Sequence, residues 1–178
     1  FQQECVKYED NSGPGNADAG RYDSASGGDP SVGISAVNFA DIFKSSGVNT
    51  YSDYTGTGTK LRPENSYALR VTLEQPPDGW FQNVRAWIDW NQNGEFENSE
   101  SYNVGECASP GCTVDTSIEV PSDASTGVTA MRVFHRESDY PDPGDSVSHG
   151  EVEDYSVEVT ERSDKVTENP CVLDGKVY

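Results

Sequence analysis

Residues 84–100 read VRAWIDWNQNGEFENSE, and this stretch joins the two patterns on which the interpretation of the whole chain depends. Its first half alternates, because Val84, Ala86 and Ile88 lie two positions apart, as apolar residues do on one face of a β-strand. Its second half is a run of polar, oxygen-bearing side chains around Gly94. The stretch therefore predicts a strand that leads directly into a loop with the ligands for a cation.

The same alternation recurs in further short segments separated by Gly, Pro, Asn and Asp turns. Clear segments begin near residues 67, 114, 130 and 155, and weaker ones lie near 36–42, 51–55 and 102–104. No segment shows sustained helical periodicity. We therefore expect an all-β fold: an antiparallel β-sandwich of the Ig-like or jelly-roll-like kind, with long loops and extended N- and C-terminal tails.

The chain of 178 residues is long enough for one domain. We expect an acidic, Gly-rich N-terminal segment over 1–34, the sandwich over 35–160 and a C-terminal tail over 161–178. Twelve Lys and Arg against 31 Asp and Glu give a net charge of −19. This balance argues against nucleic-acid partners, which need a positive surface. No apolar run approaches the roughly 20 residues of a membrane span, so we expect no membrane insertion.

The loop in residues 89–100 matches the calcium-loop pattern Asp-x-Asn-x-Asn-Gly-x5-Glu at every specified position. Ca²⁺ takes six to eight hard oxygen ligands. Side-chain oxygens of Asp89, Asn91 and Asn93 would supply three of them, and Gly94 would permit the sharp turn. The sequence therefore predicts a Ca²⁺ site here.

Two further ligands complete this predicted site. Glu95 would contribute its main-chain carbonyl oxygen and Glu100 a bidentate carboxylate. The preceding segment is a predicted strand, whereas an EF-hand has a helix there, so Glu100 is the less firmly placed ligand. The alternative is an Asn-Gly hairpin turn with solvated acids and no metal.

A second acidic region covers 139–145 and 149–155, and it contains the acidic cluster Glu151, Glu153 and Asp154. The spacing of this region matches no calcium loop, and a solvated loop is the simpler interpretation of it. On an alternating strand, however, Glu151 and Glu153 would share the inward face of Tyr155. An inward carboxylate needs a cation, an Arg or backbone donors, so the cluster is a second candidate site.

The four cysteines indicate disulfides. Cys107 and Cys112 flank a Pro-Gly turn, which suits a small disulfide loop, and Cys5 and Cys171 remain to tie the two ends together. Zinc is the rival interpretation, but no Cys-x-x-Cys pair occurs and neither His is near the thiols in sequence. Disulfides imply an oxidising compartment, hence an extracellular or cell-surface location.

Exposed aromatic rings could serve as stacking platforms for a glycan. The candidates are Trp80, which follows a Pro-Pro-Asp-Gly turn, Trp87 and Tyr140. The alternative is that Trp87 packs beneath a second layer and Trp80 caps the edge of the sandwich.

The chain resembles the GEVED domain family of secreted bacterial proteins. The residues that carry the resemblance are Gly150-Glu151-Val152-Glu153-Asp154 followed by Tyr155, together with 84–96, 118–121 and 127–133. The lead-in at 51–55 is also similar, so the resemblance covers roughly 35–160. It implies a β-sandwich accessory domain of extracellular proteins, without a known catalytic activity or a settled ligand.

These observations lead to one functional expectation and one alternative. We expect a secreted, calcium-binding, non-enzymatic structural or adhesion module that could self-assemble into an extracellular surface filament. Its partners would be further copies or other surface proteins, reached through the tails. The alternative is a carbohydrate-binding accessory module of a secreted hydrolase or protease.

Overall fold

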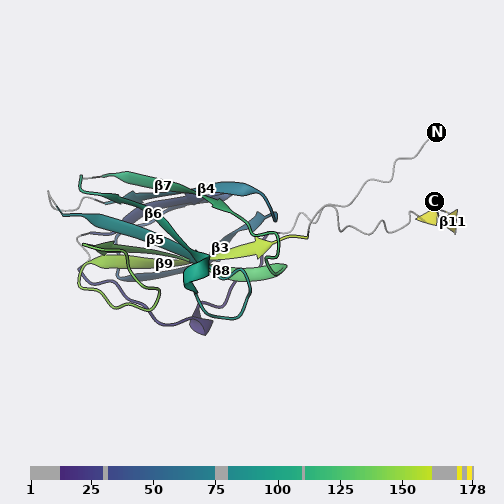
Figure 1. Ribbon diagram of the computed structural model, residues 1–178, viewed down its shortest axis with the longest axis horizontal. Helices are drawn as coiled ribbons and strands as arrows, with labels where there is room; N and C mark the ends of the chain where they lie inside the picture. The colour runs from purple at the N-terminus through teal and green to yellow at the C-terminus, as the bar shows by residue number, and fades with distance from the viewer. Residues whose placement is uncertain are drawn as a thin grey trace.

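The computed structural model describes residues 13–29, 32–74, 80–109 and 111–161, together with the backbone of 172–173 and 176–177. Two β-sheets pack face to face (Figure 1). The described residues contain no α-helix, only the short 3₁₀ turns η1 (Ala19–Arg21) and η2 (Asn98–Glu100). The prediction of an all-β sandwich is therefore confirmed.

The first sheet has four strands in the order β2-β1-β4-β7. Their bounds are β1 (Ile34–Phe39), β2 (Ile42–Ser45), β4 (Ser66–Leu73) and β7 (Thr113–Glu119). All neighbours in this sheet are antiparallel. In β4, Leu69, Val71 and Leu73 are buried while Ala68 and Arg70 are exposed, as the alternation predicts.

The second sheet has five strands in the order β3-β9-β8-β5-β6. Their bounds are β3 (Tyr51–Leu61), β9 (Gly150–Val159), β8 (Gly127–Glu137), β5 (Gln82–Ile88) and β6 (Ser101–Cys107). β3 runs parallel to β9, whereas the other pairs are antiparallel. The parallel pair is an addition to the predicted antiparallel sandwich. A separate two-residue pair joins β10 (Val172–Leu173) and β11 (Lys176–Val177).

The main core fills the space between the two sheets. Its buried members come from both sheets and include Phe39, Leu69, Ile88, Met131 and Tyr155. β5, β8 and β9 are buried on both faces, because a second cluster lies on the outer face of the five-stranded sheet. The buried residues of this outer cluster are Ala25, Trp87, Phe134 and Val152.

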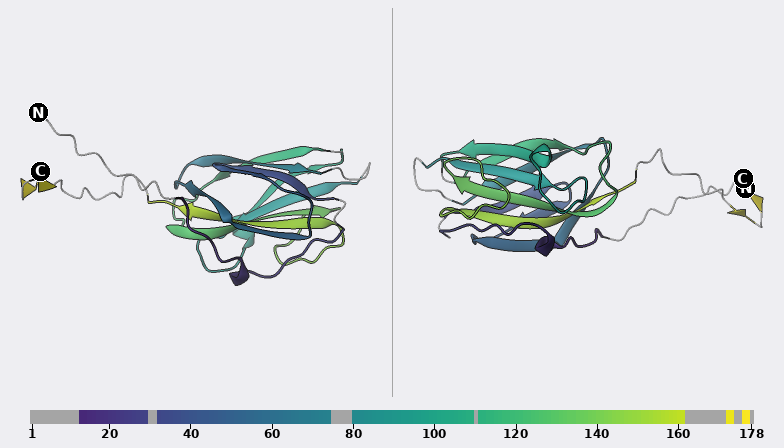
Figure 2. Two further views of the ribbon diagram at one scale, coloured as in Figure 1. Left: turned by 180° about the vertical axis from the view of Figure 1, so that it is seen from behind. Right: turned by 60° about the horizontal axis from the view of Figure 1, so that its bottom comes forward.

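The outer cluster is covered by residues 13–29, which we call the N-terminal strap. The strap crosses the outer face of the five-stranded sheet as an irregular segment (Figure 2). The Ala17 N–H donates to Ser156 Oγ at 2.7 Å, and the Gly27 N–H donates to the Thr50 carbonyl at 2.8 Å. A Cβ atom at position 27 would overlap a main-chain oxygen of the neighbouring strand, so only glycine fits there.

Cys107 and Cys112 form a disulfide between β6 and β7, with their Cα atoms 6.5 Å apart. The predicted Cys5–Cys171 pair lies outside the described residues. No helix in the described part of the chain is long and apolar enough to cross a membrane.

Candidate functional site

The predicted calcium loop begins at the end of β5 with a buried carboxylate. The Asp89 side chain has no exposed surface. Its Oδ1 accepts a hydrogen bond from the Asn93 N–H at 3.1 Å, and its Oδ2 accepts one from the Gly94 N–H at 3.0 Å. The chain therefore turns back on the first predicted ligand within five residues.

The next two predicted ligands, Asn91 and Asn93, also accept hydrogen bonds from main-chain N–H groups two residues further along the loop. Asn91 Oδ1 accepts from the Asn93 N–H at 2.9 Å, and Asn93 Oδ1 accepts from the Glu95 N–H at 2.8 Å. Gly94 has φ of 90°, a left-handed conformation that favours glycine. These contacts curl residues 89–95 around their own side-chain oxygens.

Glu100 returns to the start of the loop. Its Oε1 accepts from the Asn91 N–H at 3.2 Å and its Oε2 from the Glu97 N–H at 3.3 Å. The side chain is 4% exposed, and its burial, assisted by the charge of Asp89, raises the pKa of Glu100. The structure thus brings the first and last predicted ligands together.

The donor set of this loop fits a hard cation. It combines the carboxylates of Asp89 and Glu100 with the amide oxygens of Asn91 and Asn93, and oxygen-only sets of this kind suit Ca²⁺. In the described part of the chain, no three His, Cys, Asp or Glu side chains are grouped to hold a metal. A cation in this loop would therefore depend on the asparagine oxygens and the main chain, including the Glu95 carbonyl.

The second acidic cluster does not form one site, because β9 sends its members to opposite faces. Glu151 and Glu153 point into the sandwich with no exposed surface, whereas Asp154 lies on the outer face. The interpretation as a solvated loop is wrong for these three residues: β9 is covered on both faces, so its acids are buried.

The two inward carboxylates are only partly satisfied. Glu151 Oε2 accepts from the Ile34 N–H of the opposite sheet at 2.9 Å, and Glu153 Oε2 accepts from the Tyr155 hydroxyl at 2.6 Å. Within the described residues, the Oε1 atom of each has no hydrogen-bond partner. Burial raises the pKa of Glu151 to about 7 and also raises that of Glu153. Both carboxyl groups are therefore easier to protonate than an exposed glutamate.

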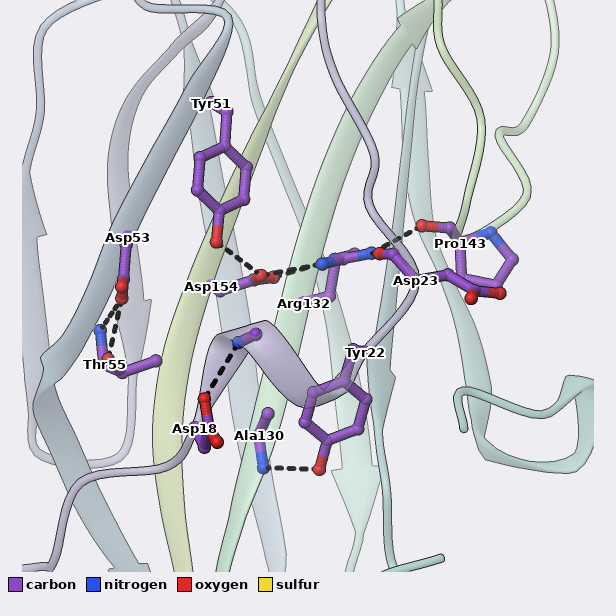
Figure 3. Close-up of polar contacts among 11 residues, drawn as sticks. Asp18, Tyr22, Asp23, Tyr51, Asp53, Thr55, Ala130, Arg132, Pro143 and Asp154 are labelled. Atoms are coloured by element: carbon purple, nitrogen blue, oxygen red, sulfur yellow. Dashed lines mark hydrogen bonds and ion pairs between the residues drawn. The ribbon is translucent and has the colours of Figure 1, made fainter. Parts of the chain in front are cut away.

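On the outer face of the sheet, the Asp154 carboxylate is paired with the Arg132 side chain (Figure 3). The Arg132 guanidinium donates to both of its carboxylate oxygens at 2.8 Å, and both side chains are 1% exposed. Arg132 Nη1 also donates to the carbonyls of Asp23 and Pro143, each at 2.7 Å. This buried pair joins β8 and β9 to the strap and to the loop before β9, so its role is structural.

The aromatic candidates have three different environments. Trp87 is fully buried in the outer cluster and presents no face to a sugar, which corrects its assignment as a stacking platform. Tyr140 is half-buried beneath Arg85, whose guanidinium lies 5.3 Å from the ring centre. Trp80 is 37% exposed, and its ring meets that of His149 edge-on at 5.2 Å.

Sequence reasoning missed the surroundings of Trp80. Phe81, the next residue, is 59% exposed. His149 lines an open hollow of about 290 Å³ together with Arg136 and Asp145. Exposed aromatic pairs were the available signal, but the approach of His149 depends on a loop some 70 residues away, and no local pattern predicts that.

The comparisons with known proteins agree with the resemblance inferred from the sequence. The family model of the GEVED domain matches residues 83–158. No curated protein matches the chain. Among solved structures, a family 123 glycoside hydrolase from Clostridium perfringens is similar with a TM-score of 0.38 and 12% identity. That match covers 62% of this chain and 23% of the hydrolase, too little likeness to carry a functional argument.

The matched residues contain both candidate regions of the structure. They run from β5 through the curled loop at 89–100 to the end of β9, where the Gly-Glu-Val-Glu-Asp motif lies buried on both faces of the sheet. The chain therefore contains a GEVED domain at residues 83–158.

Proposed function

We propose that the chain is a secreted, non-enzymatic structural or adhesion module whose loop at residues 89–100 binds Ca²⁺. The observation that carries the proposal is the curl of this loop around its own oxygens, with Asp89 and Glu100 both buried. Two buried carboxylates are costly without a counter-charge. A bound Ca²⁺ would supply that charge and stabilise the folded loop.

Two further observations support a non-enzymatic role outside the cell. GEVED domains are accessory modules, and the Cys107–Cys112 disulfide suits an oxidising compartment. His135 is fully buried between the sheets, beside Gln82, where no substrate can reach it, and its burial lowers its pKa to about 4. It is therefore a core residue and is unsuited to act as a general base for a substrate.

Association between copies is supported by an exposed aromatic on an edge strand. β2 is at the edge of the four-stranded sheet, and its Phe43 is 77% exposed. Edge strands can pair with another chain, and repeated contacts of one kind produce filaments. The net charge of −19 opposes such contacts, and bound Ca²⁺ would weaken the repulsion. Negative-stain images with and without Ca²⁺ test this part of the proposal.

Calcium titration of the chelator-treated chain tests the metal site. Since the ion binds only the folded loop, about 100-fold excess over Kd should add about 2.7 kcal/mol of stability and raise Tm by about 5–10 °C. Glu100→Gln keeps the shape of the side chain but removes the charge and one oxygen, so it should abolish most of the shift. Asp89→Ala should do the same.

Glu119→Gln is the matched control, because Glu119 is exposed on β7. It should keep the wild-type calcium shift. An unchanged Tm of the wild-type chain on adding Ca²⁺, with no heat of binding by calorimetry, would show that the loop is a metal-free turn.

A glycan-binding role is the second candidate, favoured by Trp80 and Phe81. Both rings are exposed, and that of Trp80 meets His149, which lines the hollow together with Arg136 and Asp145. Sugar sites combine an aromatic face with polar groups. Retention on insoluble cellulose and chitin would test it. Trp80→Ala should abolish retention, and Phe43→Ala, which removes an exposed ring elsewhere, should not. Equal retention of the two variants would contradict this role.

A further inference from the structure

The N-terminal strap contacts the candidate calcium loop through Tyr22. The Tyr22 hydroxyl donates to Asp89 Oδ2 at 2.8 Å. Its ring stacks on that of Phe96, the apolar residue in the second half of the loop, with the ring centres 4.4 Å apart and nearly parallel. Tyr22 is 8% exposed, so this contact is an interior one although 67 positions separate Tyr22 from Asp89.

Arg21, the preceding strap residue, contacts the curl at Gln92 and Gly94. Its Nη2 donates to the Gln92 carbonyl at 2.8 Å. Its side chain lies directly over Gly94, where an added Cβ would come within 2.5 Å of Arg21 Nε. Asp18 begins the short turn η1 by accepting from the Gly20 N–H at 3.1 Å, and Tyr22 follows the end of this turn (Figure 3).

These contacts fix the orientation of the first predicted ligand. Asp89 Oδ2 accepts from both the Gly94 N–H and the Tyr22 hydroxyl, whereas Oδ1 accepts from a single donor in the described part of the chain, the Asn93 N–H. The carboxylate is thus held by three donors, and Oδ1 keeps the larger capacity for a cation. Outer partners that orient a metal ligand commonly change metal affinity by 10–100-fold when they are removed.

We propose that Tyr22 and Arg21 are positioning residues for the calcium loop, so that docking of the N-terminal strap and binding of Ca²⁺ at residues 89–100 stabilise each other. This inference rests on the proposed calcium site. Because coupling between two binding events is reciprocal, a strap that tightens calcium binding must itself be held more tightly when calcium is bound. The strap covers the outer cluster around Trp87, so calcium would also control access to that apolar face.

The experiment measures both directions of the coupling on the full chain. Calorimetry gives the Kd for Ca²⁺, and hydrogen exchange with and without Ca²⁺ gives the protection of amides in residues 18–25. Tyr22→Phe keeps the stacked ring but removes the hydroxyl. We expect it to weaken Ca²⁺ binding at least tenfold and to reduce the calcium-dependent protection of the strap.

Tyr67→Phe is the matched control, because the Tyr67 hydroxyl accepts from the Arg62 N–H at 3.0 Å in the other sheet. It should leave the Kd and the strap protection at wild-type values. If Tyr22→Phe and Tyr67→Phe bind Ca²⁺ equally, or if Ca²⁺ leaves strap exchange in the wild type unchanged, the coupling is overturned while the calcium site stands. If the wild-type chain binds no Ca²⁺, both proposals are overturned.

Discussion

The two acidic regions of this molecule have similar composition and opposite organisation. In the loop at 89–100, the chain curls, and the oxygens of Asp89, Asn91 and Asn93 accept hydrogen bonds from successive N–H groups. In the motif at 150–154, the chain is extended, and period two sends Glu153 and Asp154 to opposite faces.

The difference shows that backbone shape, more than the density of acids, decides what the acids can do. The curl gathers oxygens from one short segment, as a hard cation requires. The strand instead distributes its carboxylates among separate partners: the Ile34 N–H for Glu151, the Tyr155 hydroxyl for Glu153 and the Arg132 guanidinium for Asp154. The curled loop is therefore suited to bind a cation, whereas the strand carboxylates stabilise the fold.

Breaking the outer pair of the strand region should have the largest effect on stability. Arg132→Met leaves the Asp154 carboxylate buried without its cation, which typically costs 3–5 kcal/mol. Urea unfolding should show the loss in full. Arg136→Met, which removes the half-exposed ion pairs to Asp139 and Asp145, is the control and should cost about 1 kcal/mol or less. Equal losses would show that the buried pair has no special role.

The inward pair of the strand region should make stability depend on pH. Burial raises the pKa of Glu151 to about 7 from an ordinary value of 4.5, so the folded state binds this proton more tightly. Its stabilisation is complete below pH 4.5 and is lost as pH rises through 7. Burial lowers the pKa of His135 from 6.5 to about 4, so its stabilisation is present above pH 6.5 and is lost as pH falls. Between about pH 4 and pH 7, the contributions of Glu151 and His135 to stability therefore change in opposite directions with pH.

Glu151→Gln separates the two contributions. Relative to the wild type, the variant should gain on the order of 3 kcal/mol of stability between pH 4.5 and pH 8, because only the wild type loses the proton. Urea unfolding in the presence of chelator measures this. Glu158→Gln, on the same strand but ion-paired with Lys60 at 3.9 Å, should follow the wild-type profile. A Glu151→Gln profile parallel to the wild type would contradict the assigned proton.

The sequence predicted the local parts of this comparison well. Alternation in Val84, Ala86 and Ile88 predicted β5, because this pattern depends on the geometry of consecutive residues. The spacing of Asp89, Asn91 and Asn93 places their oxygens in one short curled segment for the same reason, and Ca²⁺ binding there stays a prediction. The inward direction of Glu151 and Glu153 followed from the same period. The alternation of apolar and polar residues did not predict which strands are neighbours in a sheet.

The long-range parts could not be predicted for that reason. Arg132 lies on the outer face of β8, and its partners there are Asp154 of the next strand and the Asp23 carbonyl of the strap, which no local pattern identifies. The strap itself has no periodicity, so its docking through Tyr22 leaves no local signal. The parallel pairing of β3 was equally hidden, since its Thr- and Gly-rich sequence does not specify a partner.

Glycine substitutions give the smallest and most specific test of the comparison. Gly94→Ala in the loop imposes φ of 90° on an alanine, at about 1–2 kcal/mol, and its Cβ must displace the flexible Arg21 side chain. Gly150→Ala in the strand brings a Cβ against the rigid main-chain oxygen of His135, so it should cost more. Thermal unfolding in the presence of chelator should therefore show a smaller decrease in Tm for Gly94→Ala than for Gly150→Ala. Only Gly94→Ala should then weaken the response to Ca²⁺, because it alone alters the curl that gathers the oxygens. A weaker calcium response in Gly150→Ala of equal size would mean that general loss of stability, and not the curl, governs binding.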